Sequence, residues 1–140
     1  MSKIINQKKD ANTFIDSRLG LKSWSDYVKH FGLGSNLNID MPIVNTGFVP
    51  SYEYYDNYYG KNRWKFSNIY SLSIGQGELL VTPLQMANLA SIIANRGHYY
   101  DPKIVIKIND EKLNNSKINA LDINKEHFNY VVNAMEEVVR

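Results

Sequence analysis

Few side chains in this sequence have the types and spacings that could do chemistry together. Nucleophilic catalysis needs a nucleophile beside a base, but the chain has no cysteine and no Gly-x-Ser-x-Gly segment. No serine is followed by a lysine three positions later, and no lysine by a glycine two positions later. His30, His98 and His127 are far apart and form no His-x-x-x-His pair for a metal. The sequence therefore predicts no catalytic residue, no metal ligand and no cofactor.

The closely spaced glycines of Gly75-Gln76-Gly77 could direct backbone N–H groups toward an anion. The segment lacks the Gly-Lys-Ser/Thr end of a phosphate loop and the third glycine of a dinucleotide fingerprint. A tight turn, in which glycine allows close backbone approach, is therefore the favoured interpretation over nucleotide binding.

The segment Tyr52–Tyr70 is rich in aromatic residues and includes Trp64 and nearby cations. Aromatic faces beside cations can stack on sugars or on unpaired bases. The commoner alternative is a long, ordered connection whose rings pack onto the domain, because the segment has no clean period of 2 or 3.6.

Three helices should position these residues. The first starts near Ile15, carries apolar residues at a spacing of three to four as far as Phe31, and stops at Gly32 and Gly34. An irregular segment of turns and short extended pieces follows, over Ser35–Pro50.

The second helix is predicted over Pro83–Arg96, with Thr82 as N-cap, Gln85 completing a capping box and Gly97 ending it. Its apolar character on nearly all sides predicts burial on most of them.

After this helix, His98–Pro102 is predicted as a turn, Lys103–Ile108 as a strand and Glu111–Asp122 as a polar surface excursion. The excursion includes Asn114-Asn115-Ser116, which matches the sequon for N-glycosylation. A match of three residues is close to chance in a chain so rich in asparagine. The third helix follows an Asn124 or Asp122 cap, and its apolar residues recur at helical spacing: Phe128, Val131, Val132, Met135, Val138 and Val139.

Composition indicates one modest globular domain or a piece of a larger one. The 140 residues are 44% hydrophobic and carry 16 basic and 14 acidic side chains. A formal charge of +2 is too weak for a nucleic-acid footprint, so no nucleic-acid partner is predicted. No stretch is apolar enough to span a bilayer, so the chain as given should be soluble. The last helix reaches Arg140 without a stop signal, which favours a cut through a longer protein.

A joint pattern gives the sequence a resemblance to a known family. Gly-Gln-Gly is followed at a short distance by Thr-Pro-Leu-Gln, and the helix closes on Ala-Asn-Arg-Gly. This pattern resembles the transpeptidase domain of class B penicillin-binding proteins, and the similarity extends over essentially residues 1–140. Within the family, the tyrosine-rich segment looks most like penicillin-binding protein 2 of Bacteroidetes-type bacteria. The residues of the pattern, all expected to be structural, are Gly75, Gln76, Gly77, Thr82, Pro83, Gln85, Asn95 and Gly97.

The resemblance implies an α+β fold, mainly α. The chain would be a fragment of the serine beta-lactamase/transpeptidase-like fold, with helices and one or two short antiparallel strands. It implies a parent D,D-transpeptidase that crosslinks peptidoglycan stem peptides, is acylated by beta-lactams, and is anchored in the inner membrane with this domain in the periplasm. The family's Ser-x-x-Lys, Ser-x-Asn and Lys-Thr/Ser-Gly motifs are absent here. By order along the family chain, the first two would lie before Met1 and the third after Arg140. The chain alone is therefore expected to be inactive.

The resemblance also implies partners, namely the remainder of the transpeptidase domain and, through the parent, the stem peptides. Self-association of the isolated chain is expected through helix faces that include Phe128, Val131 and Met135. Two other function classes stay open. One is a non-catalytic glycan-binding or interaction module that uses Tyr52–Tyr70, and the other is a scaffold for elongation-machinery partners.

Overall fold

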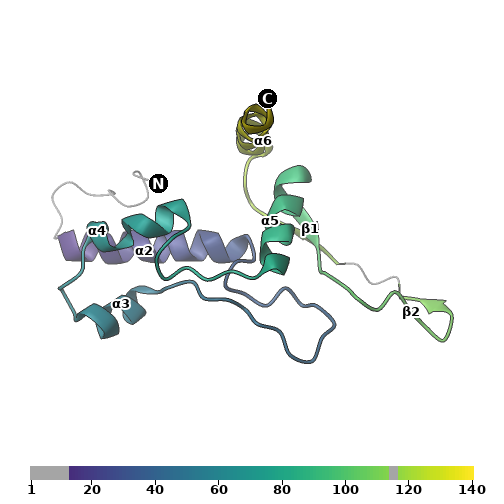
Figure 1. Ribbon diagram of the computed structural model, residues 1–140, viewed down its shortest axis with the longest axis horizontal. Helices are drawn as coiled ribbons and strands as arrows, with labels where there is room; N and C mark the ends of the chain where they lie inside the picture. Colours follow the sequence, from purple (N-terminus) through teal and green to yellow (C-terminus); the bar gives the residue numbers. More distant parts are fainter. Residues whose placement is uncertain (1–12, 114–116) are drawn as a thin grey trace. The chain divides into compact units, whose positions relative to one another are not determined.

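The computed structural model describes residues 13–113 and 117–140, so the Asn114-Asn115-Ser116 sequon lies outside the described residues. The chain divides into two compact units. The first runs to Gly34 and continues over Gly47–Val81, and the second comprises Ser35–Thr46 and Thr82–Arg140. The elements along the described chain are α2 (Thr13–His30), α3 (Tyr52–Tyr59), α4 (Phe66–Ile69), the 3₁₀ helix η1 (Tyr70–Ile74), α5 (Pro83–Ala94), β1 (His98–Tyr100), β2 (Lys107–Ile108), β3 (Glu111–Lys112), β4 (Ile118–Ala120) and α6 (Lys125–Val139) (Figure 1).

Helix α2 confirms the first predicted helix. Leu21 and Trp24 are buried on one face together with small residues, while Tyr27, predicted on the same face, is half exposed. The helix ends where Gly32 and Gly34 adopt positive φ angles of 84° and 66°. Such angles are accessible to glycine without a steric penalty, so the two glycines end the helix as the sequence predicts.

The prediction of a connection without helices over Tyr52–Tyr70 is wrong, because the segment folds into α3, α4 and the start of η1. Ser51 caps α3 by accepting a hydrogen bond from the backbone N–H of Tyr54. Tyr55 and Tyr59, four residues apart, stack with ring centroids 5.3 Å apart. Residues at this spacing are neighbours on a helix, so stacked rings favour helix here. Aromatic residues on several sides of α3 hide the period that would have revealed it.

The core of the first unit is aromatic. Tyr55 and Trp64 are almost completely buried, and their ring centroids lie 5.2 Å apart. Helices α3 and α4 both pack against α2 (Figure 1). These two rings of the Tyr52–Tyr70 segment therefore belong to the core, as the packing interpretation predicted, and they are not exposed for stacking on a ligand.

In the second unit, α5 confirms the predicted capping box but ends at Ala94, two residues early. Its buried residues are Gln85, Asn88 and Ile92, on one side only, while Met86 is 47% exposed. The prediction that α5 is buried on most sides is therefore wrong for this chain. Apolar composition indicated burial of most of the helix, but in the described part of the chain the buried face is the one that carries Gln85, Asn88 and Ile92.

The strands differ from those predicted. β1 begins at His98, where a turn was predicted, and pairs antiparallel with β4 inside the predicted excursion, Tyr100 opposite Ile118. The predicted strand over Lys103–Ile108 shortens to β2, which pairs antiparallel with β3. One reason is that the Asp40 carboxylate accepts the backbone N–H groups of Ile104 and Val105, at 2.8 Å each. These two N–H groups therefore cannot also donate to a neighbouring strand.

The described residues contain four short antiparallel strands rather than the one or two predicted, and the fold class, α+β and mainly α, is confirmed. Helix α6 begins after Asn124, whose side chain accepts the N–H of Glu126. Phe128, one of the predicted self-association contacts, is buried within the second unit and is not available for such a contact, whereas Val131 and Met135 are about half exposed. Among the described residues no helix has the length and apolarity needed to cross a bilayer.

Candidate functional site

The eight pattern residues fall into two groups, one in each unit. Gly75, Gln76 and Gly77 form a turn in the first unit, and the other five lie at the two ends of α5 in the second.

The turn confirms the tight-turn prediction. Gly75 ends η1 in the left-handed region, with φ 73°, and donates its N–H to the carbonyls of Ser71 and Leu72. The N–H of Gln76 donates to the Ser71 carbonyl at 3.0 Å, and Gly77 has φ 77°. The Gln76 side chain is exposed. Positive φ at two positions explains why glycine stands on both sides of this glutamine.

Glu78 follows the turn directly and was not predicted as a site residue. Its carboxylate accepts hydrogen bonds from the hydroxyls of Tyr55, at 2.6 Å, and Tyr59, at 3.0 Å. Burial together with the Glu78 hydrogen bond raises the pKa of Tyr55, so this phenol stays protonated and able to donate. Burial by itself would raise the pKa of Glu78, but the hydrogen bonds that it accepts hold that pKa below its usual value.

At the start of α5, Gln85 makes three hydrogen bonds through its side chain. Its Oε1 accepts the backbone N–H of Thr82 at 3.0 Å, and the Thr82 Oγ1 accepts the N–H of Gln85 at 3.2 Å. Its Nε2 donates to the carbonyls of Ser35 at 2.9 Å and Thr46 at 2.8 Å. The side chain is 2% exposed. One amide thus caps α5 and attaches the Ser35–Thr46 segment to it, using both of its N–H donors and one of its two acceptor lone pairs.

At the other end of α5, the backbone N–H of Asn95 donates to the Ser91 carbonyl, and Gly97 has φ 104°. Gly97 donates its N–H to Ile92 at 2.9 Å and accepts the N–H of Leu121 at 2.8 Å. A Cβ at Gly97 would lie 2.9 Å from a ring carbon of Phe128. Glycine is required at this position by both the backbone angle and the close approach of the ring.

The pattern of these two groups of residues also occurs in known proteins, as a family match shows. Residues 6–140 match the family described as penicillin binding protein transpeptidase domain. The chain belongs to this family.

Two relatives and two solved structures show the extent of the similarity. Peptidoglycan D,D-transpeptidase MrdA of Acinetobacter baumannii is 30% identical over 89 residues, which are 64% of this chain and 13% of that protein. Penicillin-binding protein PbpB of Mycobacterium tuberculosis is 32% identical over 91 residues, 65% of this chain and 12% of that protein. The crystal structure of Pseudomonas aeruginosa PBP2 in complex with WCK 5153 has a TM-score of 0.73 and 25% identity, with 90% of this chain and 29% of that chain covered. Penicillin-binding protein 2B of Streptococcus pneumoniae has a TM-score of 0.69 and 24% identity, covering 93% and 22%.

This transpeptidase-family chain therefore spans less than a third of each of these relatives. The resemblance to penicillin-binding proteins is confirmed. The predicted closeness to penicillin-binding protein 2 of Bacteroidetes-type bacteria is not tested by these relatives and stays a prediction.

The three histidines lie on three different elements. His30 lies at the end of α2 in the first unit, and His98 and His127 lie on β1 and α6 in the second. Over residues 13–113 and 117–140, no group of three or more histidine, aspartate, glutamate or cysteine side chains could hold a metal ion. The pattern residues close helix ends, make turns and attach a loop, so what they contribute is the placement of elements.

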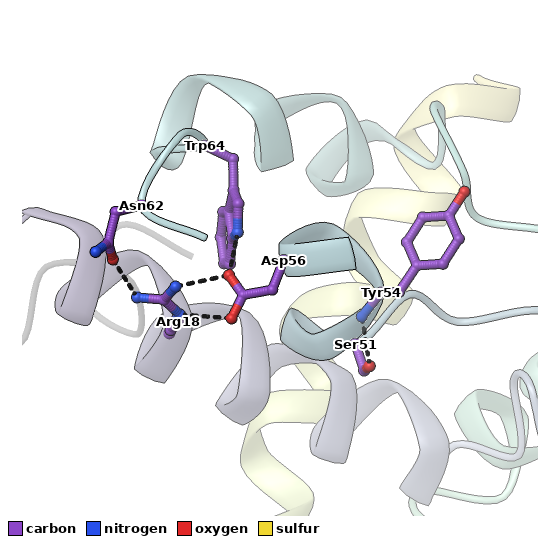
Figure 2. A network of polar contacts seen from close by, with 6 residues as sticks. All are labelled: Arg18, Ser51, Tyr54, Asp56, Asn62 and Trp64. Atoms are coloured by element: carbon purple, nitrogen blue, oxygen red, sulfur yellow. Dashed lines mark hydrogen bonds and ion pairs between the residues drawn. The ribbon is translucent and has the colours of Figure 1, made fainter. Parts of the chain in front are cut away.

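A polar network in the first unit was also missed by sequence reasoning (Figure 2). Arg18 on α2 donates to both carboxylate oxygens of Asp56 on α3, at 3.1 and 2.6 Å, and to the side chain of Asn62 at 2.9 Å. Trp64 Nε1 donates to the same carboxylate at 2.8 Å. The Arg18 and Asp56 side chains are only 17% and 19% exposed. The Arg18 hydrogen bond, followed by that of Trp64, holds the pKa of Asp56 below its usual value.

Replacing Asp56 with asparagine should lower the free energy of unfolding by about 2 kcal/mol at pH 7, because three charge-assisted hydrogen bonds are weakened and Arg18 keeps an unpaired charge. The folded pKa of Asp56 lies below its unfolded value of about 3.9, so its contribution is present above that pH and is lost as the pH falls through the folded pKa. Urea unfolding at pH 7 and near pH 3 should therefore show a difference between wild type and variant that shrinks in acid.

The matched control is Asp26→Asn on the same helix as Arg18. Asp26 pairs with Lys22 at 2.8 Å, but both side chains are more than half exposed. An exposed pair contributes little, so this variant should lose less than about 0.5 kcal/mol. Equal losses in the two variants would show that the Asp56 network has no special role in the first unit.

Proposed function

We propose that this chain is a non-catalytic segment of a peptidoglycan D,D-transpeptidase, lying between the Ser-x-Asn and Lys-Thr/Ser-Gly motifs of its parent. One observation carries the proposal. Residues 6–140 match the transpeptidase family, yet the chain contains none of the family's three catalytic motifs. The coverage of 29% of the Pseudomonas aeruginosa PBP2 chain supports the same conclusion. Acyl transfer without a nucleophile and its base has no group to activate.

The parent's activity follows from the same assignment. A parent serine would attack the D-Ala-D-Ala end of a stem peptide, release D-alanine and pass the acyl group to a neighbouring stem, and beta-lactams would acylate that serine. In this scheme the segment contributes placement. The Gln85 amide and the Gly97 helix end fix α5 within the second unit. The Asp56 network fixes α2 and α3 within the first.

The partners of the segment are, in this proposal, the remainder of the transpeptidase domain and, through the parent, peptidoglycan stem peptides. In the same proposal, the parent is anchored in the inner membrane and this domain lies in the periplasm. Self-association of the isolated chain through Val131 and Met135, both about half exposed on α6, stays a prediction.

A labelling experiment tests the absence of chemistry in the chain. The 140-residue chain is incubated with a fluorescent penicillin, denatured and separated on a gel, and no labelled band is expected, because no serine has a lysine three positions later. A whole penicillin-binding protein treated in parallel should give a labelled band. A band of the chain that survives denaturation would contradict the proposal.

The position of the segment in its parent is tested by sequencing the coding region on both sides. Ser-x-x-Lys and Ser-x-Asn are expected upstream in the same reading frame, and Lys-Thr-Gly or Lys-Ser-Gly downstream. A reading frame that holds none of the three would overturn the assignment to a transpeptidase while leaving the fold intact.

A further inference from the structure

The Gly75-Gln76-Gly77 turn is exposed, and its backbone hydrogen bonds are local. The N–H groups of Gly75 and Gln76 donate to carbonyls of η1, at 3.2 and 3.0 Å, within a span of five residues. An added Cβ at Gly75 would meet no atom within 4 Å. Glycine permits the two positive φ angles, but it also gives the unfolded and partly opened turn more freedom than any other residue. A turn of this kind needs an anchor beyond its local bonds.

Glu78, the next residue, has the contacts of such an anchor. Its carboxylate accepts one phenol at 2.6 Å and a second at 3.0 Å, from Tyr55 and Tyr59 on α3. Hydrogen bonds to an ionised acceptor are about twice as strong as neutral ones. Both oxygens are engaged, Oε2 by Tyr55 and Oε1 by Tyr59, so the carboxylate cannot rotate without losing a partner.

Tyr55 belongs to the core of the first unit, and Tyr59, which is partly exposed, stacks on it. Their rings stack at 5.3 Å with an interplanar angle of 19°, and the buried Tyr55 ring also packs on Trp64. Trp64 in turn donates to the Asp56 carboxylate that Arg18 binds. The Glu78 carboxylate therefore connects the exposed turn to a rigid aromatic core, across 19 to 23 residues of sequence.

We propose that Glu78 is the positioning residue of the Gly75-Gln76-Gly77 turn, which its carboxylate holds in place through the hydroxyls of Tyr55 and Tyr59. Loss of the Glu78 charge loosens the turn while the first unit stays folded. This property belongs to the chain's own fold and goes beyond the proposed function, so it can fail or hold independently of it.

Amide hydrogen exchange of the 140-residue chain, followed by NMR at neutral pH, tests the proposal. In Glu78→Gln the amides of Gly75 and Gln76 should exchange about tenfold faster, because a neutral acceptor replaces a charged one and local opening becomes easier. In Tyr59→Phe, which removes only the 3.0 Å bond, the same amides should exchange about threefold faster. Amides of the α2 helix should be unchanged in both variants.

Glu111→Gln is the matched control, since Glu111 is an exposed glutamate on β3 in the second unit and the substitution makes the same change of charge. It should leave exchange at the turn unchanged. Unchanged exchange rates of the turn amides in both test variants would overturn the proposal. Equal acceleration of exchange in the turn and in α2 would also overturn it, because Glu78 would then contribute only to the overall stability of the unit. If Glu78→Gln does not fold, Tyr59→Phe tests the proposal: faster exchange of the turn amides with unchanged exchange in α2 supports it, and equal changes in both overturn it.

Discussion

Replacing Gly97 with alanine should lower the free energy of unfolding of the chain by about 4 kcal/mol. The φ angle of 104° lies outside the regions that residues with a Cβ adopt, which costs about 1–3 kcal/mol. The new Cβ would also lie 2.9 and 3.2 Å from two ring carbons of Phe128. Phe128 is buried, so its ring cannot move into solvent, and overpacking of this kind costs about 1–3 kcal/mol more. Urea unfolding followed by circular dichroism measures the loss.

Gly75→Ala is the control for backbone strain without crowding. Gly75 has φ 73°, and an added Cβ would meet nothing within 4 Å, so its loss should be about 1 kcal/mol. In the double variant, Phe128→Ala should remove the crowding that Gly97→Ala causes. The loss of unfolding free energy in the double variant should therefore be smaller than the sum of the losses in the two single variants. Strictly additive losses, or a Gly97→Ala loss no larger than that of Gly75→Ala, would contradict the close approach of the ring.

Replacing Gln85 with leucine should lower the free energy of unfolding by about 3 kcal/mol. Leucine keeps nearly the same volume but removes the bond to the Thr82 N–H, an N-terminal capping contact that contributes about 1 kcal/mol. It also leaves the part-buried carbonyls of Ser35 and Thr46 without the donor that serves them both, at a cost of about 1–3 kcal/mol. Thermal and urea unfolding should agree on the loss.

Two further variants separate the parts of this loss. Gln76→Leu, at the exposed glutamine of the turn, should change stability by less than about 0.5 kcal/mol. Gln85→Glu keeps an acceptor for the Thr82 N–H but directs a carboxylate oxygen at two carbonyls, so it should destabilise at least as strongly as leucine. A Gln85→Glu variant as stable as wild type would show that the cap, and not the attachment of the Ser35–Thr46 segment, is what Gln85 provides.

Features governed by neighbours in sequence could be predicted from the sequence alone. The end of α2 at Gly32, the capping box of Thr82 and Gln85, and the Asn124 cap of α6 each depend on contacts within about four residues. The Gly75-Gln76-Gly77 turn belongs to the same class, because glycine is the residue that tolerates its backbone angles. The family, too, was recognisable from a linear pattern, and it is confirmed by the match over residues 6–140.

Features that depend on distant residues were missed or wrongly predicted. The Tyr52–Tyr70 segment shows no helical period, because rings lie on several sides of α3. The contacts that attach α3 to the rest of the first unit come from Arg18 and Glu78, which are 38 and 23 residues away from their partners Asp56 and Tyr55. The strand predicted at Lys103–Ile108 was shortened, since Asp40, more than 60 residues away in sequence, takes the two N–H groups that a strand would need.

The sequence by itself thus determined the glycines that follow α2, the capping box of α5, the tight turn, and membership of the transpeptidase family. Only the tertiary structure decided that Tyr55 and Trp64 form the core, that Arg18 pairs with Asp56, and that Glu78 holds two tyrosines. The physical reason is that caps and turns satisfy backbone groups within a few residues, whereas a carboxylate or an aromatic ring takes its role from whichever partners the folded chain brings within hydrogen-bond or van der Waals distance.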